Sequence, residues 1–144
     1  MKGKRTALRL PSTVRKLDEY ERGWIEAAID GEGSFLLRKT KHNNWHCTLE
    51  ISNTDKRFLE KAKKMIGDGK IYSSYEKKER RFQLFRRNAL IDLLSQLSLT
   101  IKERQRILII EALGLIQRRE YEPLVSILQE FKILNERNKF AQSE

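Results

Sequence analysis

The stretch from residue 23 to residue 35, GWIEAAIDGEGSF, constrains the fold of this chain more than any other part of it. Small residues recur at every fourth position, at Gly23, Ala27 and Gly31. On a helix they lie on one side and form a smooth ridge. Such a ridge lets a second helix approach closely, ridge against groove. The stretch therefore predicts a helix from about residue 18 to residue 31 that packs against another helix.

The same stretch is acidic, although the chain carries 30 Lys plus Arg against 20 Asp plus Glu. Residues 24–35 hold Glu26, Asp30 and Glu32 and no basic residue. The C-terminal end of a helix is already negative, so Glu32 costs stability there unless a cation is bound. A basic side chain or a divalent metal meets that need. One carboxylate with the free carbonyl oxygens of a helix end makes a hard oxygen site suited to Mg²⁺.

The net charge of +10 and the pI near 9.9 indicate a polyanionic partner, with nucleic acid as the leading candidate. The one cysteine, Cys47, cannot pair within the chain, which indicates a reducing intracellular compartment. No apolar run approaches the length of a membrane span, so we expect no membrane partner. Residues 1–16 contain six basic residues and no acid. This composition is typical of a transit peptide and of a basic arm that contacts phosphates. We expect a basic arm over residues 1–17 and one domain over residues 18–144.

Alternation and helical periodicity predict four strands and four further helices. The strand-like runs cover residues 34–41, 45–52, 70–75 and 80–86, with a turn at residues 43–44 between the first two. The helical runs cover residues 54–66, 88–98, 102–119 and 123–138, and Asn53 or Thr54 is expected to cap the first of them. This order predicts an α+β domain, an antiparallel four-stranded sheet with helices on one face.

Period-two alternation also predicts which face of the sheet is polar. Trp45, Cys47, Leu49 and Ile51 share the core side, and the other side is rich in groups that can read base edges in the major groove of DNA. Glu50 has two interpretations, an acceptor for cytosine or an ion pair with Arg38. The outward positions expected to contact DNA are Ser34, Arg38, Thr40, His42, Asn44, His46, Thr48, Glu50, Lys70, Tyr72, Ser74, Glu79, Arg81 and Gln83.

Residues 24–35, WIEAAIDGEGSF, resemble the signature of the LAGLIDADG homing endonucleases in its variant ending IDGEGSF. The runs ISNTDKRFLEKAKKMIG and LTIKERQ extend the resemblance over about residues 20–118. The resemblance implies an αββαββα core followed by C-terminal helices. Because the chain shows one motif, it also implies a homodimer whose paired motif helices carry two saddle-shaped sheets onto double-stranded DNA. The expected dimer contacts are Gly23, Trp24, Ala27, Ala28 and Gly31.

The resemblance also implies the catalytic residues. Glu32 would bind Mg²⁺ with the carbonyl of Gly31, Lys102 would reach the active site, and Asn53 would contact the nucleophilic water. Lys102 has the alternative of an ordinary solvated lysine, and Asn53 that of a helix cap. Arg104 and Gln105 are expected to support the same solvent network, and Asp30 to be structural.

Two positions depart from the signature. Glu26 replaces a small apolar residue and is expected at the edge of the dimer interface or paired with Arg22. Trp24 is bulkier than usual. A zinc site at His42, His46 and Cys47 is disfavoured, because no second cysteine completes a tetrahedral set and alternation separates His46 from Cys47.

The implied function is a homodimeric, Mg²⁺-dependent endonuclease that cuts double-stranded DNA at a long pseudo-palindromic site. It has no small-molecule substrate and is expected inside the cell, with DNA. The length of the chain favours a free-standing or intron-encoded protein over an intein. Two alternatives use the same scaffold, an RNA maturase and a DNA-binding regulator that has lost cleavage. Either can dispense with Glu32.

Overall fold

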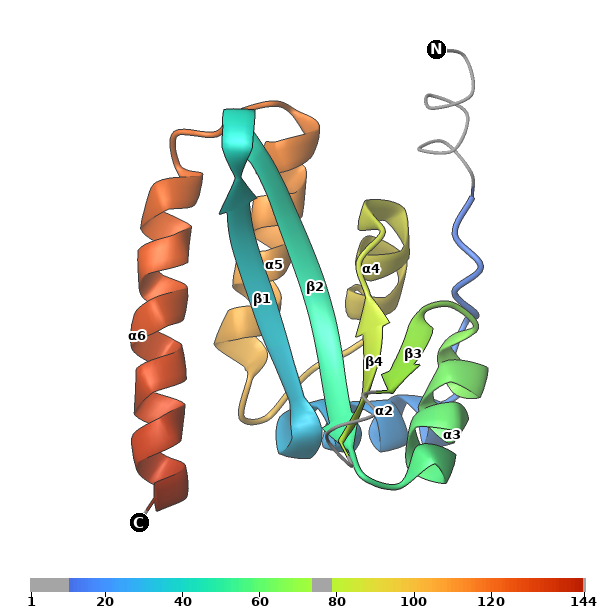
Figure 1. The fold of residues 1–144 in the computed structure, drawn as a ribbon. Coiled ribbons are helices and arrows are strands. Elements are labelled where there is room, and N and C mark those ends of the chain that lie inside the picture. Colours follow the sequence, from blue (N-terminus) through green and yellow to red (C-terminus); the bar gives the residue numbers. More distant parts are fainter. Residues whose placement is uncertain (1–10, 74–78, 144) are drawn as a thin grey trace.

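The computed structural model describes residues 11–73 and 79–143, the last seven of these as backbone only (Figure 1). The chain forms an α+β fold with a four-stranded antiparallel sheet, which confirms the predicted fold class. The elements in chain order are α2 (Glu19–Glu32), β1 (Gly33–Thr40), the short 3-10 turn η1 (Lys41–Asn43), β2 (Asn44–Asn53), α3 (Lys56–Ile66), β3 (Lys70–Ser73), β4 (Arg80–Leu84), α4 (Arg87–Leu94), α5 (Glu103–Gln117) and α6 (Leu124–Ser143).

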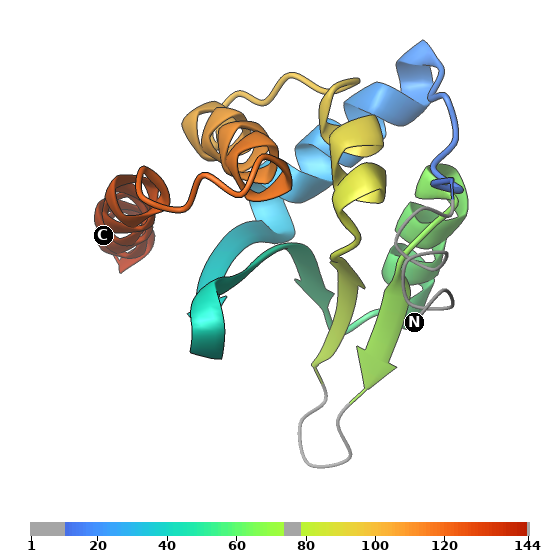
Figure 2. The same cartoon turned by 90° about the horizontal axis from the view of Figure 1, so that it is seen from above.

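The four strands lie in the order β1-β2-β4-β3, so β1 and β3 form the two edges. Figure 2 shows the helices on one side of the curved sheet, with its other side uncovered. The register places Ser34 opposite Glu50, Glu50 opposite Gln83, and Gln83 opposite Lys70. One polar row therefore crosses all four strands at the end of the sheet where α2 leads into β1.

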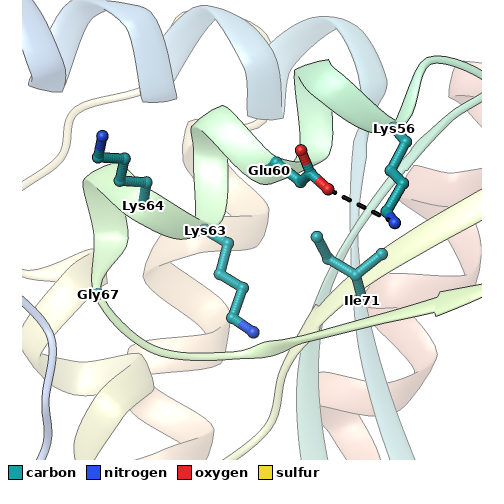
Figure 3. Close-up of a pocket in the computed structure, with 6 residues that line it drawn as sticks. All are labelled: Lys56, Glu60, Lys63, Lys64, Gly67 and Ile71. Atoms are coloured by element: carbon teal, nitrogen blue, oxygen red, sulfur yellow. Dashed lines mark ion pairs between the residues drawn. The ribbon is translucent and has the colours of Figure 1, made fainter.

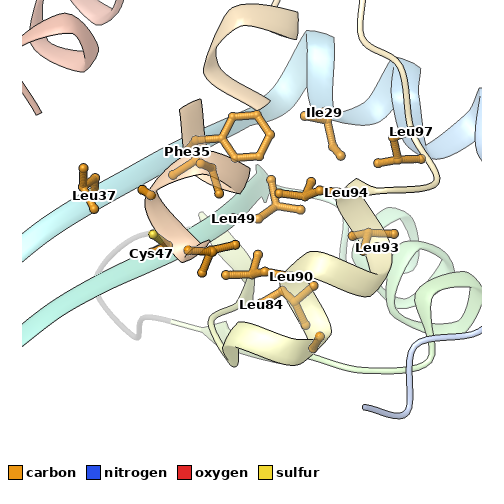
Figure 4. Close-up of a cluster of buried hydrophobic side chains, with 14 of the residues drawn as sticks. Ile29, Phe35, Leu37, Cys47, Leu49, Leu84, Leu90, Leu93, Leu94 and Leu97 are labelled. Carbon is orange, nitrogen blue, oxygen red and sulfur yellow. The ribbon is translucent and has the colours of Figure 1, made fainter. Parts of the chain in front are cut away.

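The core lies between the sheet and its helices (Figure 4). Phe35 and Leu37 of β1 and Leu49 of β2 are buried against apolar side chains of α2, α4 and α5, as the alternation predicts. Helix α6 packs on α5 and on the edge strand β1 through Leu124, Ile127 and Phe131. Among the described residues, no helix has both the length and the apolar character needed to cross a bilayer.

Two turns differ from the sequence prediction. The β1–β2 turn is Lys41–Asn43, one residue or two earlier than expected, because His42 and Asn43 adopt the left-handed conformation with φ of 63° and 56°. His42 therefore projects from this turn and not from a strand. The N-cap of α3 is Asp55 and not Asn53 or Thr54, since its carboxylate accepts from the Arg57 N–H at 2.9 Å.

The segment before α2 packs on the domain. The Thr13 hydroxyl donates to the carbonyl of Gly67 at 2.7 Å, the Arg15 N–H donates to that of Ile66 at 2.8 Å, and Leu17 is buried. Residues 13–17 thus pack on the domain, although they precede its expected start at residue 18. Composition could not reveal this, because the contacts are with residues about fifty positions away. The first ten residues lie outside the described part.

Candidate active site and nucleic-acid interface

Helix α2 delivers the acidic stretch to the end of the sheet. It begins with a capping box, in which the Asp18 carboxylate accepts from the Glu21 N–H and the Glu21 carboxylate accepts from the Asp18 N–H. It ends where the chain turns directly into β1. A side chain at Gly33 would place its Cβ 2.8 Å from the carbonyl oxygen of Ile29, so only glycine permits this turn. The helix end is thereby fixed against the sheet.

Two of the three acids bind the loop between α4 and α5. The Asp30 carboxylate accepts from the backbone N–H groups of Thr100, Ile101 and Lys102 at 2.8 to 3.1 Å. One turn earlier, the Glu26 carboxylate accepts from the Ser98 N–H at 2.6 Å. The expected pairing of Glu26 with Arg22 does not form, because Glu26 faces this loop. The contacts join residues about seventy positions apart.

Lys102, at the end of this loop, binds back to helix α2. Its ammonium donates to the carbonyl oxygens of Ile29 and Asp30 at 3.0 and 2.9 Å. Burial lowers the pKa of Lys102, while the charges of Asp30 and Glu32 act in the opposite direction. Lys102 is therefore not a freely solvated lysine, and its positive charge offsets the negative end of α2.

Glu32 is the acid of this stretch that stays exposed. Among the described residues its carboxylate forms no hydrogen bond or ion pair, and the last turn of α2 contains no basic residue. The preceding Gly31 is also exposed. A carboxylate beside helix-end carbonyls is a donor set that fits Mg²⁺. Within the described part of the chain, no group of three or more His, Cys, Asp or Glu side chains is placed to hold a metal.

Asn53, predicted to be catalytic, and Arg104 and Gln105, expected to support the solvent network, have contacts with other parts of the chain. The Asn53 side chain accepts from the Asp55 N–H at 2.8 Å, and Asn53 lies half-buried at the end of β2. Arg104 forms an ion pair with Glu130 of α6 at 2.7 Å. Gln105 is buried in the first turn of α5. None of these contacts joins Asn53, Arg104 or Gln105 to Glu32.

The uncovered face of the sheet carries the side chains predicted from the alternation. Arg38 lies opposite His46 and Thr40 opposite Asn44 on the β1–β2 pair. Thr48 lies opposite Leu36, an apolar residue that the prediction omitted from this face. Tyr72 lies opposite Arg81 on the β3–β4 pair, and Glu79 precedes β4. Ser74 lies outside the described residues.

Glu50 lies in the polar row at the α2 end of this face, and its carboxylate contacts side chains of β4. The Gln83 side-chain amide donates to Glu50 Oε2 at 2.9 Å, and Arg81 Nη1 lies 3.6 Å from Glu50 Oε1. The expected ion pair with Arg38 does not form, because Arg38 lies four residues further along β1 than Ser34, the partner of Glu50. Glu50 therefore belongs to a network with β4.

The small-residue ridge of α2 faces outward. Gly23, Ala27 and Gly31 are exposed, and a Cβ added at either glycine would meet no atom within 4 Å. Two other expected dimer contacts, Ala28 and Trp24, are less exposed than this ridge. Ala28 is buried within the chain and is removed from the expected dimer contacts. Trp24 is half-buried against Phe58, with ring centroids 5.0 Å apart.

Helix α3 adds a basic groove that the sequence analysis did not single out. Lys56, Lys63 and Lys64, with Ile71 of β3, line a surface groove of about 570 Å³ (Figure 3). Lys56 lies 3.6 Å from Glu60, whereas neither Lys63 nor Lys64 has an ion pair within the described residues. The run KRFLEKAKK contained the signal, since its lysines are not balanced by acids.

The histidines and the cysteine do not converge. Cys47 is buried, and burial raises the pKa of its thiol to about 12. His46 is exposed on the opposite face of β2, and His42 lies in the turn. These positions follow the predicted alternation at residues 46 and 47.

Solved homing endonuclease structures share this fold, whereas no protein-family model and no curated protein matches the sequence. The archaeal intron-encoded homing endonuclease I-Vdi141I, complexed with DNA, superposes with a TM-score of 0.73 at 19% identity and covers 81% of this chain and 84% of its own. I-CvuI, in complex with its target in the presence of Ca, gives a TM-score of 0.69 at 15% identity, covering 81% and 85%. The LAGLIDADG meganuclease I-AabMI, bound to uncleaved DNA, gives 0.65 at 26% identity, covering 73% of this chain and 42% of its own.

Proposed function

We propose that this chain is a LAGLIDADG homing endonuclease of the single-motif type, which cuts double-stranded DNA as a homodimer with Mg²⁺. The observation that carries the proposal is the state of the three acids of α2. Glu26 and Asp30 bind the loop before α5, whereas the Glu32 carboxylate is exposed beside the uncovered face of the sheet. The chain thus keeps one free carboxylate at the place where a phosphodiester would meet it. I-Vdi141I and I-AabMI, which share this fold, were solved bound to DNA, and this supports the same interpretation.

The residues of this chain divide the work between binding and positioning. Cations and amides of the sheet face, such as Arg38 and Arg81, contact the grooves and the phosphates. Glu32 and the Gly31 carbonyl would hold the metal. When bound, Mg²⁺ polarises a phosphodiester and lowers the pKa of a bound water. Lys102 keeps a cation next to this site and offsets phosphate charge, and Asp30 fixes the loop that carries Lys102.

A homodimer accounts for the exposed ridge. Gly23, Ala27 and Gly31 are exposed, and no described residue packs on the two glycines of this helix face. A two-fold contact between two such ridges brings two helix ends, each with its Glu32, to the same place. Each copy would then cut one strand.

Cleavage of a randomised duplex library by the purified chain in Mg²⁺ tests the proposal, with the ends identified by sequencing. We expect ends that share one long, nearly palindromic site. Glu32→Gln should reduce cutting by about 10² or more, because one charged metal ligand is lost. The variant should still retain the same duplexes, because its fold is unchanged. Asp92→Asn, which removes an exposed acid from α4, should cut as the unchanged chain does.

The alternatives give different results in the same experiment. A regulator that has lost cleavage would retain specific duplexes and produce no ends. A maturase would prefer folded intron RNA to duplex DNA in a competition assay. Equal cutting by Glu32→Gln and by the unchanged chain would contradict the assignment of Glu32.

A further inference from the structure

Glu50 is an acid in the polar row that crosses the face that the proposed function lays on DNA. A carboxylate repels phosphates, so its position on this face needs a reason. Its side chain is only 12% exposed, and both of its oxygens face partners on β4. Glu50 is therefore poorly placed to read a base itself.

The partners of Glu50 are better placed to do so. The Arg81 side chain is 47% exposed and lies between two carboxylates, with Nη1 3.6 Å from Glu50 and Nη2 3.9 Å from Glu79. These two contacts leave other N–H groups of the guanidinium free, since arginine has five in a fixed fork. A long side chain held in one orientation loses less conformational entropy when it binds. Glu50 thus orders a cation that would otherwise be flexible.

We propose that Arg81 is a specificity-determining residue that reads guanine, and that Glu50 is the positioning residue that holds its guanidinium. This inference rests on the proposed function, because it needs DNA on the uncovered face. Arginine pairs with guanine O6 and N7 in a bidentate contact, which discriminates about 5- to 150-fold against other bases. The Gln83 amide strengthens the arrangement, because its 2.9 Å hydrogen bond fixes the Glu50 carboxylate.

The strand register says where in the target the guanine lies. Glu50 is opposite Ser34, and Ser34 is two residues after Glu32. The network is therefore beside the end of α2, so Arg81 reads a base pair close to the cut bonds. In a two-fold dimer the same guanine preference recurs once in each half of the site.

Retention of randomised duplexes by the full chain without Mg²⁺ tests the inference, because binding is then measured apart from cutting. The unchanged chain should enrich guanine at one symmetric pair of positions near the centre. Arg81→Ala and Glu50→Gln should each reduce that enrichment about 5-fold or more at the same positions and leave the others unchanged. Glu50→Asp, which keeps the charge, should restore part of it.

Arg38→Ala is the matched control, since Arg38 lies on the same face opposite His46 and has no contact with Glu50. It should change a different position of the consensus. Loss of the guanine preference in Arg81→Ala but not in Glu50→Gln would overturn the positioning role of Glu50. An unchanged consensus in Arg81→Ala would overturn the reading role of Arg81. Retention of no specific duplex by the unchanged chain would overturn the proposed function itself, a result distinct from both.

Discussion

Asp30 and Lys102 form a reciprocal contact between the end of α2 and the start of α5. The carboxylate binds backbone N–H groups of the loop, and the ammonium binds backbone carbonyls of the helix. Each side chain satisfies groups that a helix terminus leaves without a partner. The Glu32 carboxylate takes no part in this contact and remains exposed.

Replacing Asp30 by Asn tests how much the loop depends on this contact. The amide keeps one acceptor oxygen and loses the negative charge, so three charge-assisted hydrogen bonds weaken or break. We expect the free energy of unfolding to fall by about 1–3 kcal/mol, measured by urea denaturation. Asp92→Asn, on the exposed face of α4, should change it by less than about 0.5 kcal/mol. Equal stability of the two variants would contradict the structural role of Asp30.

Replacing Lys102 by Met keeps the length of the side chain and removes its cation. We expect cutting to fall by about 10² or more, because a cation that interacts with the Glu32 carboxylate is lost, whereas retention of the target duplex should remain. The measurement is single-turnover cleavage together with a duplex-retention assay. A parallel loss of both would indicate that Lys102 acts on the fold or on binding and not on the reaction.

At the scale of single elements, α3 places its apolar and basic residues on separate sides. Leu59, Ala62 and Ile66 are buried against the sheet, while Lys63 and Lys64 line the groove beside the edge strand β3 (Figure 3). Gly67 ends the helix with φ of 87°, a conformation that favours glycine. The lysines therefore lie beside the sheet edge formed by β3.

Binding at different salt concentrations tests the contribution of this groove. Lys63→Ala should weaken the binding of every duplex by a similar factor and reduce the slope of log K against log salt by about 0.9 if Lys63 neutralises one phosphate. The consensus sequence should not change. Lys132→Ala, exposed on α6 at the other side of the molecule, is the control and should leave the slope unchanged. An unchanged slope for both variants would place the duplex away from α3.

The sequence predicted the strands better than the contacts between elements. Alternation at Trp45, Cys47, Leu49 and Ile51 placed the polar face correctly, because a side chain on a strand has two choices of face. The caps were harder, since Asn53 and Asp55 both bind backbone N–H groups and differ only in geometry. The role of Glu26 was not predictable, because its partner at residue 98 is brought near by the whole fold.

At the scale of the whole molecule, the loop from residue 98 to residue 102 is held from two sides. Helix α2 binds it through Glu26 and Asp30, and Glu103 binds it from α5 by accepting from the Leu99 N–H at 2.9 Å. Arg106 holds Glu103 in turn at 2.6 Å and donates to the carbonyl of Leu94. Helix α2, the loop and α5 thus form one connected unit.

This unit predicts an acid dependence of stability. The Arg106 guanidinium lowers the pKa of Glu103 to about 2, against an ordinary value of 4.5. The unfolded chain then binds more protons than the folded chain between these values. The contribution of the Glu103–Arg106 ion pair to the free energy of unfolding is therefore complete above about pH 4.5 and is lost as the pH falls toward 2. Thermal unfolding of Glu103→Gln should be less steeply dependent on pH in this window than that of the unchanged chain, and identical slopes would contradict the assignment.

Assembly is the other property of the whole molecule. Ala27→Arg puts a charged side chain on the ridge of α2, where no described residue packs against the neighbouring glycines. We expect the fold to remain and the sedimenting mass to fall from two chains to one, with cutting lost. A change at Val125, exposed on α6, should leave the mass unchanged. A single chain in the unaltered protein would contradict the homodimer.

The different duties of the three acids of α2 have a consequence for comparing related genes. A descendant that binds DNA and no longer cuts it still needs Asp30 and Glu26 to fold, because both hold the loop before α5. Selection would keep most of the signature in such a protein and would tolerate substitution only at position 32. If Glu32 holds the metal as proposed, the identity of that one residue, more than the completeness of the signature, separates genes for cutting proteins from genes for proteins that only bind.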